Sequence, residues 1–454
     1  MTIQPDYVKE ELLHELSESF CMHNQLPPDL FTRYRIKRGL RNADGTGVLV
    51  GASHLGNVHG YILNEGEREP IEGRLTYRGY NVYDLIHGLE QENRFGFEEI
   101  GYLLMCGKLP SRRQLAEFQH TIGLERALPD NFTEDMIMRA PSRDIMNKLA
   151  SATLALYSYD ANPDETTVEN IMRQGISLMA KFPVIISHAY QAKRRYFDND
   201  SMFLHVPDPN RSTAENILHL IRPTGEFNDD EAKLLDRCLI LHAEHGGGNN
   251  STFTCRCVTS TGTDAYAAYA SAISALKGPR HGGANIKVME MLNCIENGVK
   301  NWENEGEVAD FLTKILNKEE NDHSGLIYGM GHAVYTLSDP RAVQLKKSAL
   351  KLAKGTEVEA EFRLLDTIER LTPQLFAKNK GDIKTMCANV DMYSGLVYKL
   401  LGIPVEMYTA LFACARMPGW CAHRMEEIEN GKRIMRPAYR TLIKNRDYIA
   451  LDER

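Results

Sequence analysis

The sequence has no apolar run long enough to cross a membrane and no large excess of one charge. Its most apolar late stretch, 396–415, is interrupted by Lys399, Pro404 and Glu406, which argues against a membrane-spanning helix. The N-terminus mixes acidic and apolar residues, so no secretory signal is readable. The formal net charge of −8 excludes a broad basic footprint for nucleic acid or an anionic membrane. We therefore expect a cytoplasmic protein that contacts neither.

Disulfide-rich and repetitive proteins are also excluded. The nine cysteines are an odd number without a repeating spacing, which favours reduced thiols over a disulfide framework. No internal repeat or low-complexity segment is visible. What the sequence does have is length: 454 residues, 43% apolar and 25% charged, are enough for a large core in a globular protein of two domains.

Apolar residues recur at helical spacing along most of the chain, and this pattern predicts an all-α fold. The predicted helices span 7–20, 82–87, 97–106, 112–127, 144–157, 168–194, 213–220, 229–242, 265–276, 284–295, 308–317, 340–353, 356–368 and 391–401. Between 47 and 78, β-branched or aromatic runs alternate with glycine and turn residues, which predicts a small N-terminal hairpin. Gly402-Ile403-Pro404 is either a plain interhelix turn or a hinge.

The stretch GMGHAVYTLSDPR (329–341) sets His332 on a glycine-flanked turn, where the backbone can approach a ligand closely. Ser338 or Asp339 is expected to cap a helix that begins with Pro340. Arg341 then lies in the first turn, where unpaired N–H groups already favour an anion such as a carboxylate. The alternative is that His332 is a buried structural histidine and Arg341 a surface charge.

A second histidine, His281, stands in LKGPRHGGAN (276–285), directly before a predicted helix. A helix N-terminus disfavours imidazolium, and Lys277 and Arg280 are close in sequence. His281 is therefore expected to stay neutral and able to donate a hydrogen bond to a carbonyl that becomes an enol. A structural histidine on a tight turn is the alternative.

The third motif, LHAEHGGGNNST (241–252), allows three interpretations. Its glycines resemble a phosphate cradle, but the motif lacks the P-loop lysine and follows no strand. His242 and His245 could bind zinc with Cys255 and Cys257, although this spacing matches no common structural zinc site. Alternatively, His245 contacts substrate at the mouth of a glycine-lined pocket.

Two further motifs carry an aspartate and two arginines. Asp391 in CANVDMYSG (387–395) is a candidate general base or a helix N-cap. Arg416 stands where Pro418-Gly419 is expected to break a helix, and Arg436 follows about one helix-turn-helix later in the chain. Arginine forks at such breaks suit the binding of carboxylates. With the histidines, these residues indicate chemistry on a dianionic carbonyl compound, and no cofactor motif competes.

Taken in this order, the motifs resemble the citrate synthase family, as do LTYRGYNVYDLI (75–86) and RPAYR (436–440). The resemblance spans about 47–439. It implies a nearly all-helical homodimer in which a large domain, 1–282 with 403–454, and a small mobile domain, 283–402, enclose the active site. The Gly402 turn would then be the hinge.

The family condenses acetyl-CoA with oxaloacetate and hydrolyses citryl-CoA to citrate and CoA. The resemblance implies that Asp391 removes a methyl proton, that His281 stabilises the enol, and that His332 polarises the oxaloacetate carbonyl and protonates the alkoxide. No cofactor is implied, because acetyl-CoA is a substrate. The implied supporting residues are His245, Arg341, Arg416 and the second subunit's Arg436 for oxaloacetate, Ser251 to orient His281, and Ile327, Gly329, Met330, Gly331 and Asn389 for CoA.

Two positions depart from the family pattern, and two functional alternatives stay open. Arg280 replaces an apolar residue beside His281, and Glu244 replaces an aspartate, which we interpret as a minor packing change.

A 2-methylcitrate synthase would use propionyl-CoA with the same residues, because one methyl group changes affinity by only about 1–3 kcal/mol. A catalytically silent binding protein on the same fold is the other alternative. No bound metal is predicted.

Overall fold

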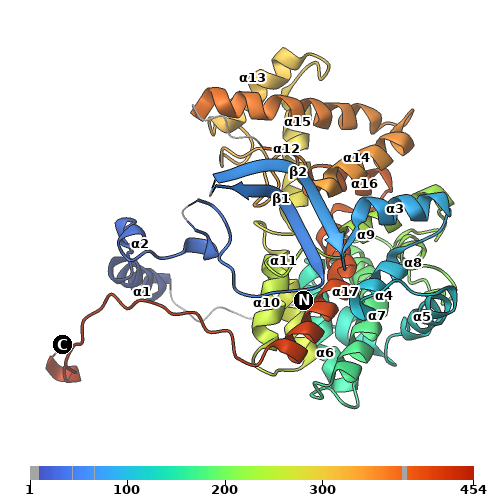
Figure 1. The fold of residues 1–454 in the computed structure, drawn as a ribbon, viewed down its shortest axis with the longest axis horizontal. Helices are drawn as coiled ribbons and strands as arrows, with labels where there is room; N and C mark the ends of the chain where they lie inside the picture. The colour runs from blue at the N-terminus through green and yellow to red at the C-terminus, as the bar shows by residue number, and fades with distance from the viewer. Residues whose placement is uncertain (1–9, 43, 66, 381–385, 454) are drawn as a thin grey trace. The chain divides into compact units, whose positions relative to one another are not determined.

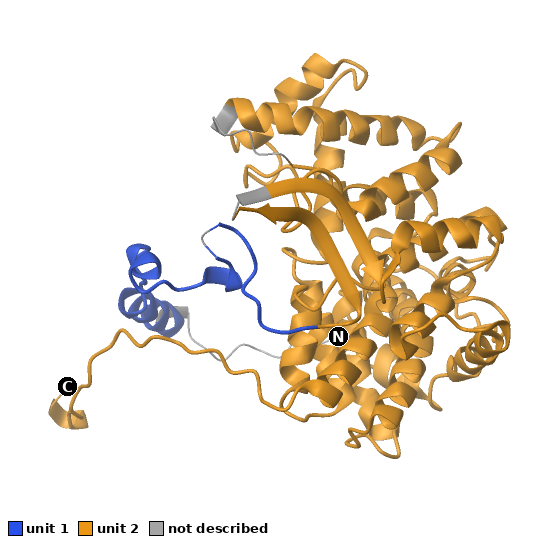
Figure 2. Cartoon of the chain, viewed as in Figure 1, with its two compact units in different colours: residues 1–52 blue, residues 53–454 orange. Residues whose placement is uncertain are grey.

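The computed structural model describes residues 10–42, 44–65, 67–380 and 386–453. The chain forms two compact units, residues 1–52 and 53–454 (Figure 2). The smaller unit contains α1 (Glu10–His23), α2 (Asp29–Arg33) and a 3-10 turn at Arg38–Leu40. The helix predicted at 7–20 corresponds to α1, and its first three residues lie outside the described part.

The larger unit begins with the predicted hairpin. β1 (Gly56–Asn64) pairs antiparallel with β2 (Glu67–Tyr77), and β2 pairs with the short β3 (Tyr80–Asn81). The register between β1 and β2 shifts between His59 and Tyr61. The hydroxyl of Tyr77 donates to the backbone oxygen of Ile240 at 2.9 Å, which ties the end of the hairpin to the helical body.

The rest of the larger unit is mainly helical (Figure 1), which confirms the all-α prediction. The helices are α3 (Val82–Gln91), α4 (Phe97–Cys106), α5 (Arg112–Glu125), a π-helix (Thr133–Met138), α6 (Ile145–Leu156), α7 (Val168–Phe197), α8 (Thr213–Ile221), α9 (Asp229–His242), α10 (Asn250–Thr259), α11 (Ala265–Lys277), α12 (Ala284–Gly298), α13 (Glu305–Leu316), α14 (Pro340–Ala353), α15 (Glu359–Lys380), α16 (Val390–Leu400) and α17 (Tyr408–Asn430), with 3-10 turns at Tyr157–Tyr159, Val405–Met407 and Leu451–Glu453. Capping boxes start α5, α8 and α9, because each cap side chain accepts a backbone N–H that lacks a helical partner.

Several helices differ from the prediction, among them α17, α15 and α10. α17 continues through Pro418, so the predicted break after Arg416 is wrong. Proline removes one helical hydrogen bond, but nearly every α17 residue up to Met425 is buried, and packing on all sides outweighs that loss. α15 likewise runs through Pro373. α10 was not predicted, because its polar Asn-Ser-Thr start is typical of a loop.

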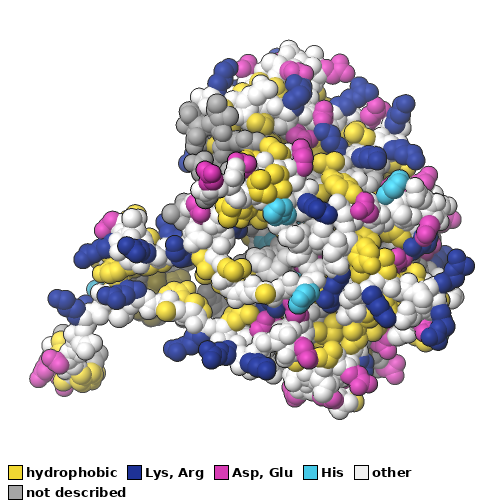
Figure 3. All heavy atoms as spheres, in the orientation of Figure 1, with side chains coloured by type: hydrophobic (Ala, Val, Ile, Leu, Met, Phe, Trp, Pro, Cys, Tyr) yellow, Lys and Arg dark blue, Asp and Glu magenta, His cyan; other side chains and the backbone are white. Residues whose placement is uncertain are grey.

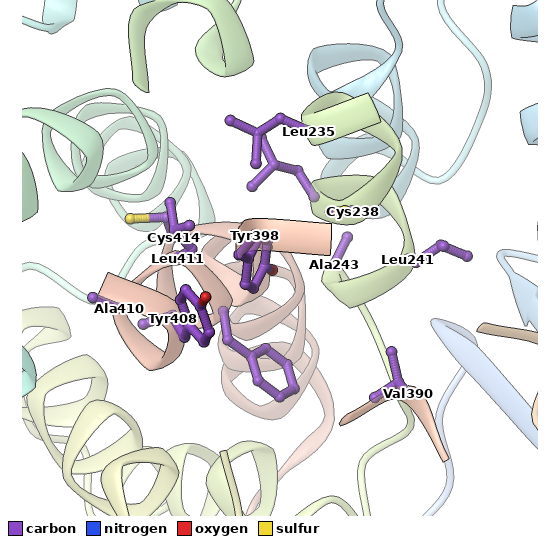
Figure 4. Close-up of a cluster of buried hydrophobic side chains, with 14 of the residues drawn as sticks. Leu235, Cys238, Leu241, Ala243, Val390, Tyr398, Tyr408, Ala410, Leu411 and Cys414 are labelled. Atoms are coloured by element: carbon purple, nitrogen blue, oxygen red, sulfur yellow. The ribbon is translucent and has the colours of Figure 1, made fainter. Parts of the chain in front are cut away.

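The hydrophobic core extends through most helices of the larger unit, and one cluster of it lies where residues of α9, α16 and α17 meet (Figure 4). Leu235 and Leu241 from α9, Tyr398 from α16 and Leu411 from α17 are each at most 2% exposed. Burying each such side chain contributes about 1.5–3 kcal/mol relative to leaving it exposed. This packing positions the end of α9, the start of α16 and the middle of α17, and these segments carry the candidate site.

α12 to α16 pack on one another, and α14 also packs on α9 and α3. After α16, Gly402 adopts φ +66°, and the N–H of Ile403 bonds to the backbone oxygen of Tyr398 at 2.9 Å. This is a left-handed helix end of the kind that favours glycine, so the segment is at least an interhelix turn. The hinge role and the domain boundaries at 283 and 402 stay predictions.

No helix in the described part of the chain combines the length and apolarity that crossing a bilayer requires. Basic and acidic side chains lie interspersed on the face drawn in Figure 3. All nine cysteines are free thiols.

Candidate active site

The turn at Gly329 and Gly331 leads into His332, whose ring lies close to the rings of His245 and Tyr335. The His245 centroid lies 5.1 Å from that of His332 and 5.7 Å from that of Tyr335, and the rings of His332 and Tyr335 stack at 4.6 Å. His332 Nδ1 accepts the backbone N–H groups of Val334 and Tyr335 at 3.1 Å each. In its neutral form the ring therefore carries its hydrogen on Nε2, the other ring nitrogen.

Arg341 lies in the first turn of α14 and is paired with the cap of its own helix. Asp339 Oδ1 accepts the Arg341 backbone N–H at 3.0 Å, and the guanidinium donates to both Asp339 oxygens at 3.0 and 2.7 Å. Both side chains are buried, so the surface-charge interpretation of Arg341 is wrong. Although burial opposes ionisation, Arg341 holds the pKa of Asp339 below its usual value. Asp339 thus holds the Arg341 guanidinium in a fixed geometry.

Arg416 is fully buried in α17 and has a different environment. Its Nε donates to the backbone oxygen of His242, and the guanidinium lies 4.9 Å from the Phe412 ring centroid. Nη1 and Nη2 have no hydrogen-bond partner in the part of the chain that the structure describes. Burial lowers the pKa of Arg416 to about 10, which leaves it charged at neutral pH. Two buried donors without acceptors suit an incoming carboxylate.

His281 is held from behind by Ser251. Its Nε2 lies 3.3 Å from the Ser251 backbone nitrogen, which donates to it, and 3.1 Å from Ser251 Oγ. Burial, with Arg416 and Arg341 nearby, lowers the pKa of His281 to about 4. The ring is neutral, as expected, but the cations responsible are not Lys277 and Arg280, whose side chains are exposed. With Nε2 accepting, Nδ1 carries the hydrogen.

Asp391 is the second residue of α16 and is not its N-cap. Asn389 is the cap, and its Oδ1 accepts the Asp391 backbone N–H at 3.0 Å. The Asp391 side chain is partly buried, and its buried Oδ1 has no hydrogen-bond partner among the described residues. Burial raises its pKa to about 7, against the opposing influence of Arg341 and Arg416. A carboxyl group with this pKa suits a general base at neutral pH.

A short backbone pairing joins the His332 turn to the start of α16. The N–H of Gly331 bonds to Cys387 O, the N–H of Asn389 bonds to Gly329 O, and Asn389 Nδ2 donates to Gly331 O, all at 2.8–2.9 Å. Gly329 and Gly331 have φ of +81° and +89°, values that favour glycine. The pairing keeps Asp391 and His332 at a set separation.

A pocket of about 240 Å³ opens beside this turn. The predicted CoA residues Ile327, Met330 and Gly331 line it, together with His332 and Tyr335; the remaining lining is Leu316, Gly325, Leu326, Thr336, Thr372, Phe376 and Met386. This largely apolar lining suits an acyl chain or a pantetheine arm. The predicted CoA residues Gly329 and Asn389 are not among the lining and support the turn instead.

One predicted residue lies elsewhere, and three neighbours were not predicted as site residues. Arg436 is exposed on the segment after α17, and the structure does not bring it to the histidines; its role across a dimer interface stays a prediction. Phe412 lies 6.5 Å from His281 between ring centroids. Phe412 is one turn before Arg416, and Tyr335 is three residues after His332, so sequence spacing could have suggested both. Asp339 was predicted only as a cap.

The zinc and packing interpretations of LHAEHGGGNNST do not match the geometry. His242 Nδ1 bonds to Cys238 O at 2.7 Å, and Cys255 Sγ lies against Trp420 O. The described residues contain no group of three or more His, Cys, Asp or Glu that could hold a metal ion. Glu244 is no minor packing change, because its fully buried carboxylate accepts a hydrogen bond from His423.

Comparison with known proteins identifies the class. The family described as "Citrate synthase, C-terminal domain" matches residues 45–438, so the chain belongs to the citrate synthase family and is an acyltransferase of that type. It is 32% identical over 387 residues to a citrate synthase of Saccharolobus solfataricus, covering 84% of this chain and 94% of that protein. It is 33% identical over 373 residues to 2-methylcitrate synthase 2 of Corynebacterium glutamicum, covering 81% and 88%.

Solved structures agree with this assignment. The fold matches citrate synthase of Thermoplasma acidophilum, solved as a ternary complex with carboxymethyl coenzyme A and oxaloacetate, with a TM-score of 0.75 and 26% identity over 92% of this chain and 99% of that one. Citrate synthase of Thermotoga maritima matches with a TM-score of 0.73 and 31% identity, covering 92% and 99%.

Proposed function

We propose that this protein condenses acetyl-CoA with oxaloacetate and hydrolyses the resulting citryl-CoA to citrate and CoA. The observation that carries the proposal is the Asp391 carboxyl group: its pKa is raised to about 7, its Oδ1 has no hydrogen-bond partner among the described residues, and a short backbone pairing joins it to the His332 turn. The ligands in the Thermoplasma complex, oxaloacetate and a CoA thioether, support the same substrate pair.

In this proposal oxaloacetate binds first, between the two arginines. The fork of Arg416, which has no acceptor among the described side chains, takes one carboxylate in a bidentate pair. Arg341, fixed by Asp339, takes the other, with His245 beside it. Arg436 of the partner subunit completes the site, so the active form is a homodimer. His332 then directs Nε2–H to the carbonyl oxygen.

Acetyl-CoA places its acyl end between Asp391 and His281, with the pantetheine arm in the 240 Å³ pocket. An acyl methyl group is a very weak acid, so Asp391 can take its proton only while His281 Nδ1–H stabilises the forming enol. The enol carbon attacks the oxaloacetate carbonyl, and His332 protonates the alkoxide. Water then cleaves the thioester, which releases citrate and CoA. Both reactants are substrates, so no cofactor is needed.

Closure of the small domain, 283–402, onto the large domain completes the proposal. Gly402 is the hinge, because its left-handed backbone and exposed position allow rotation between α16 and α17. Closure excludes water until the carbon–carbon bond has formed, which protects acetyl-CoA from premature hydrolysis. A cytoplasmic setting keeps the nine free thiols reduced.

A 2-methylcitrate synthase is the second candidate, because a Corynebacterium enzyme of that name is as similar as the citrate synthases. The deciding experiment follows loss of thioester absorbance, which the protein's own cysteines do not affect, with acetyl-CoA or propionyl-CoA and with or without oxaloacetate. We expect oxaloacetate-dependent cleavage that is faster with acetyl-CoA. Faster cleavage of propionyl-CoA would select the second candidate. No cleavage of either thioester by folded dimer would leave a silent binding protein.

A further inference from the structure

Glu244 is a buried carboxylate for which the proposed reaction has no role. It lies one residue before His245 and two after His242, whose backbone oxygen accepts from Arg416. Its side chain is 0% exposed. Oε1 accepts from the backbone N–H of Gly246 at 2.5 Å and faces His423 Nε2 at 2.9 Å. A charge buried this completely is costly unless its surroundings are built to hold it.

The surroundings form a chain of buried polar groups that leads away from the site. Arg256 on α10 donates through Nε to His423 Nδ1 at 2.9 Å, so His423 directs its Nε2 hydrogen to Glu244. Arg256 also donates through Nη1 to Glu427 at 2.9 Å and pairs with Glu426. Glu244 is therefore the inner end of a network that joins the loop carrying His245 to α10 and α17.

Arg416 lies on the same face of α17 as the network residues of that helix. Arg416, His423 and Glu427 are seven and then four residues apart, so they share a helix face. Glu244 lies against this face between Arg416 and His423, because a Cβ at Gly419 would approach its Oε2 to 2.9 Å. A Cβ at Gly56 on β1 would approach Oε1 to 2.7 Å. Two glycines thus leave a slot that the longer glutamate side chain fills.

The charges of Glu244 and Arg416 depend on each other. Arg416 and His423 hold the pKa of Glu244 below its usual value despite burial. In turn, Glu244 opposes the lowering of the Arg416 pKa that burial causes. Arg416 keeps Nη1 and Nη2 unbonded among the described residues, so Glu244 stabilises its charge without occupying these two groups.

We propose that Glu244 is a positioning residue for the oxaloacetate site: it holds the His245 loop to α17 and stabilises the charge of Arg416 from behind, leaving its fork open to substrate. This inference rests on the proposed function. It makes a distinctive prediction, because removing one negative charge near a dianion should tighten binding by simple electrostatics. If Glu244 acts by positioning, its removal weakens binding instead.

The test is Glu244→Gln, which keeps the shape and removes the charge, studied in the full chain by calorimetric titration with oxaloacetate. We expect the oxaloacetate Kd to rise by about tenfold or more, because small displacements of binding groups are costly. The KM for acetyl-CoA should change by less than about twofold. An oxaloacetate Kd that is unchanged or lower in the folded variant would overturn the proposal.

Two variants separate positioning from loss of stability. Glu427→Gln breaks the outer end of the same network, so it should lower the melting temperature and leave the oxaloacetate Kd unchanged. Glu244→Asp keeps the charge and should bind oxaloacetate at least about threefold more tightly than Glu244→Gln. Equal weakening by the Asp and Gln variants, or equal weakening in Glu427→Gln, contradicts the proposal. If wild-type protein does not bind oxaloacetate, the proposed function itself fails.

Discussion

Two aspartates have the same raised pKa in very different regions of the molecule. Burial raises the pKa of both Asp391 and Asp236 to about 7. Asp236 lies in α9, where its two oxygens accept the backbone N–H groups of Gly96 and Phe97 at 2.8 and 3.1 Å and cap the start of α4. Asp391 Oδ1 has no such partner among the described residues.

The comparison shows that a perturbed pKa does not by itself identify a catalytic group. Asp236 joins two helices in the body of the protein, and its acceptors are used. Asp391 is tied by the backbone pairing to the turn that carries His332, feels the charges of Arg341 and Arg416, and has acceptor capacity left over among the described residues. A buried polar atom that lacks a partner among the described residues and lies near other candidate site residues is therefore the stronger sign of function. The following predictions test that distinction, from the largest expected effect to the smallest.

Asp391→Asn should lower kcat by about 10³-fold, because an amide cannot accept the methyl proton and general base catalysis contributes roughly 10²–10⁴-fold. Asp236→Asn, compared per folded molecule, should keep kcat within about twofold of wild type. Steady-state thioester cleavage measures both. Similar losses in the two variants would remove the distinction between the aspartates.

Arg416→Lys should raise the KM for oxaloacetate by about ten- to a hundredfold, because lysine keeps the charge but loses the bidentate fork. The KM for acetyl-CoA should stay close to wild type. Arg424, another buried arginine of α17, donates hydrogen bonds to Thr259 and Thr263. Arg424→Lys is therefore the matched control and should affect stability alone. An unchanged oxaloacetate KM in Arg416→Lys would mean that the fork does not contact substrate.

The pH dependence of kcat/KM for acetyl-CoA should report the Asp391 ionisation. With a pKa of about 7 in the free protein, the base is increasingly protonated below neutral pH. The rate constant should therefore fall by about tenfold per pH unit below pH 6 and level off above pH 8. A plateau that extends down to pH 5 would show that the essential base has an ordinary carboxyl pKa.

The stabilities of the two Asn variants should also differ. Each aspartate has a folded pKa of about 7 against 3.8 in the unfolded chain, so the wild type loses stability as pH rises between these values. Both variants should thus gain relative to wild type from pH 5 to pH 8. These gains should be similar, but at each pH Asp391→Asn should be more stable than Asp236→Asn by about 1–3 kcal/mol, because Asp236→Asn leaves a helix N–H without an acceptor. Urea unfolding at both pH values measures the difference, and an Asp236→Asn variant more stable than Asp391→Asn would reverse the comparison.

Local sequence signals predicted most of the fold and named several side chains that the structure places near one another. Glycine, proline and polar caps marked the bounds of α4, α9 and α14, which match the structure to the residue. The course of α17 was not predictable, because its continuity through Pro418 depends on burial by distant helices. Asp391 and His281 were suggested as site residues because each stands at the start of a predicted helix. The pKa of His281, however, is lowered by burial and by Arg416 and Arg341, which lie in other parts of the chain. The Glu244 network depends on contacts over more than 170 residues, which no local pattern contains.

The most direct test of the account is exchange of the acetyl-CoA methyl protons in D₂O, followed by NMR. Exchange is measured with an oxaloacetate-shaped dicarboxylate that lacks the reactive carbonyl, so that proton removal is seen without condensation. We predict exchange that depends on the analogue in the wild type. We predict no exchange in Asp391→Asn, provided that the variant is shown to bind acetyl-CoA. Exchange that persists in Asp391→Asn would contradict the assignment of Asp391 as the base.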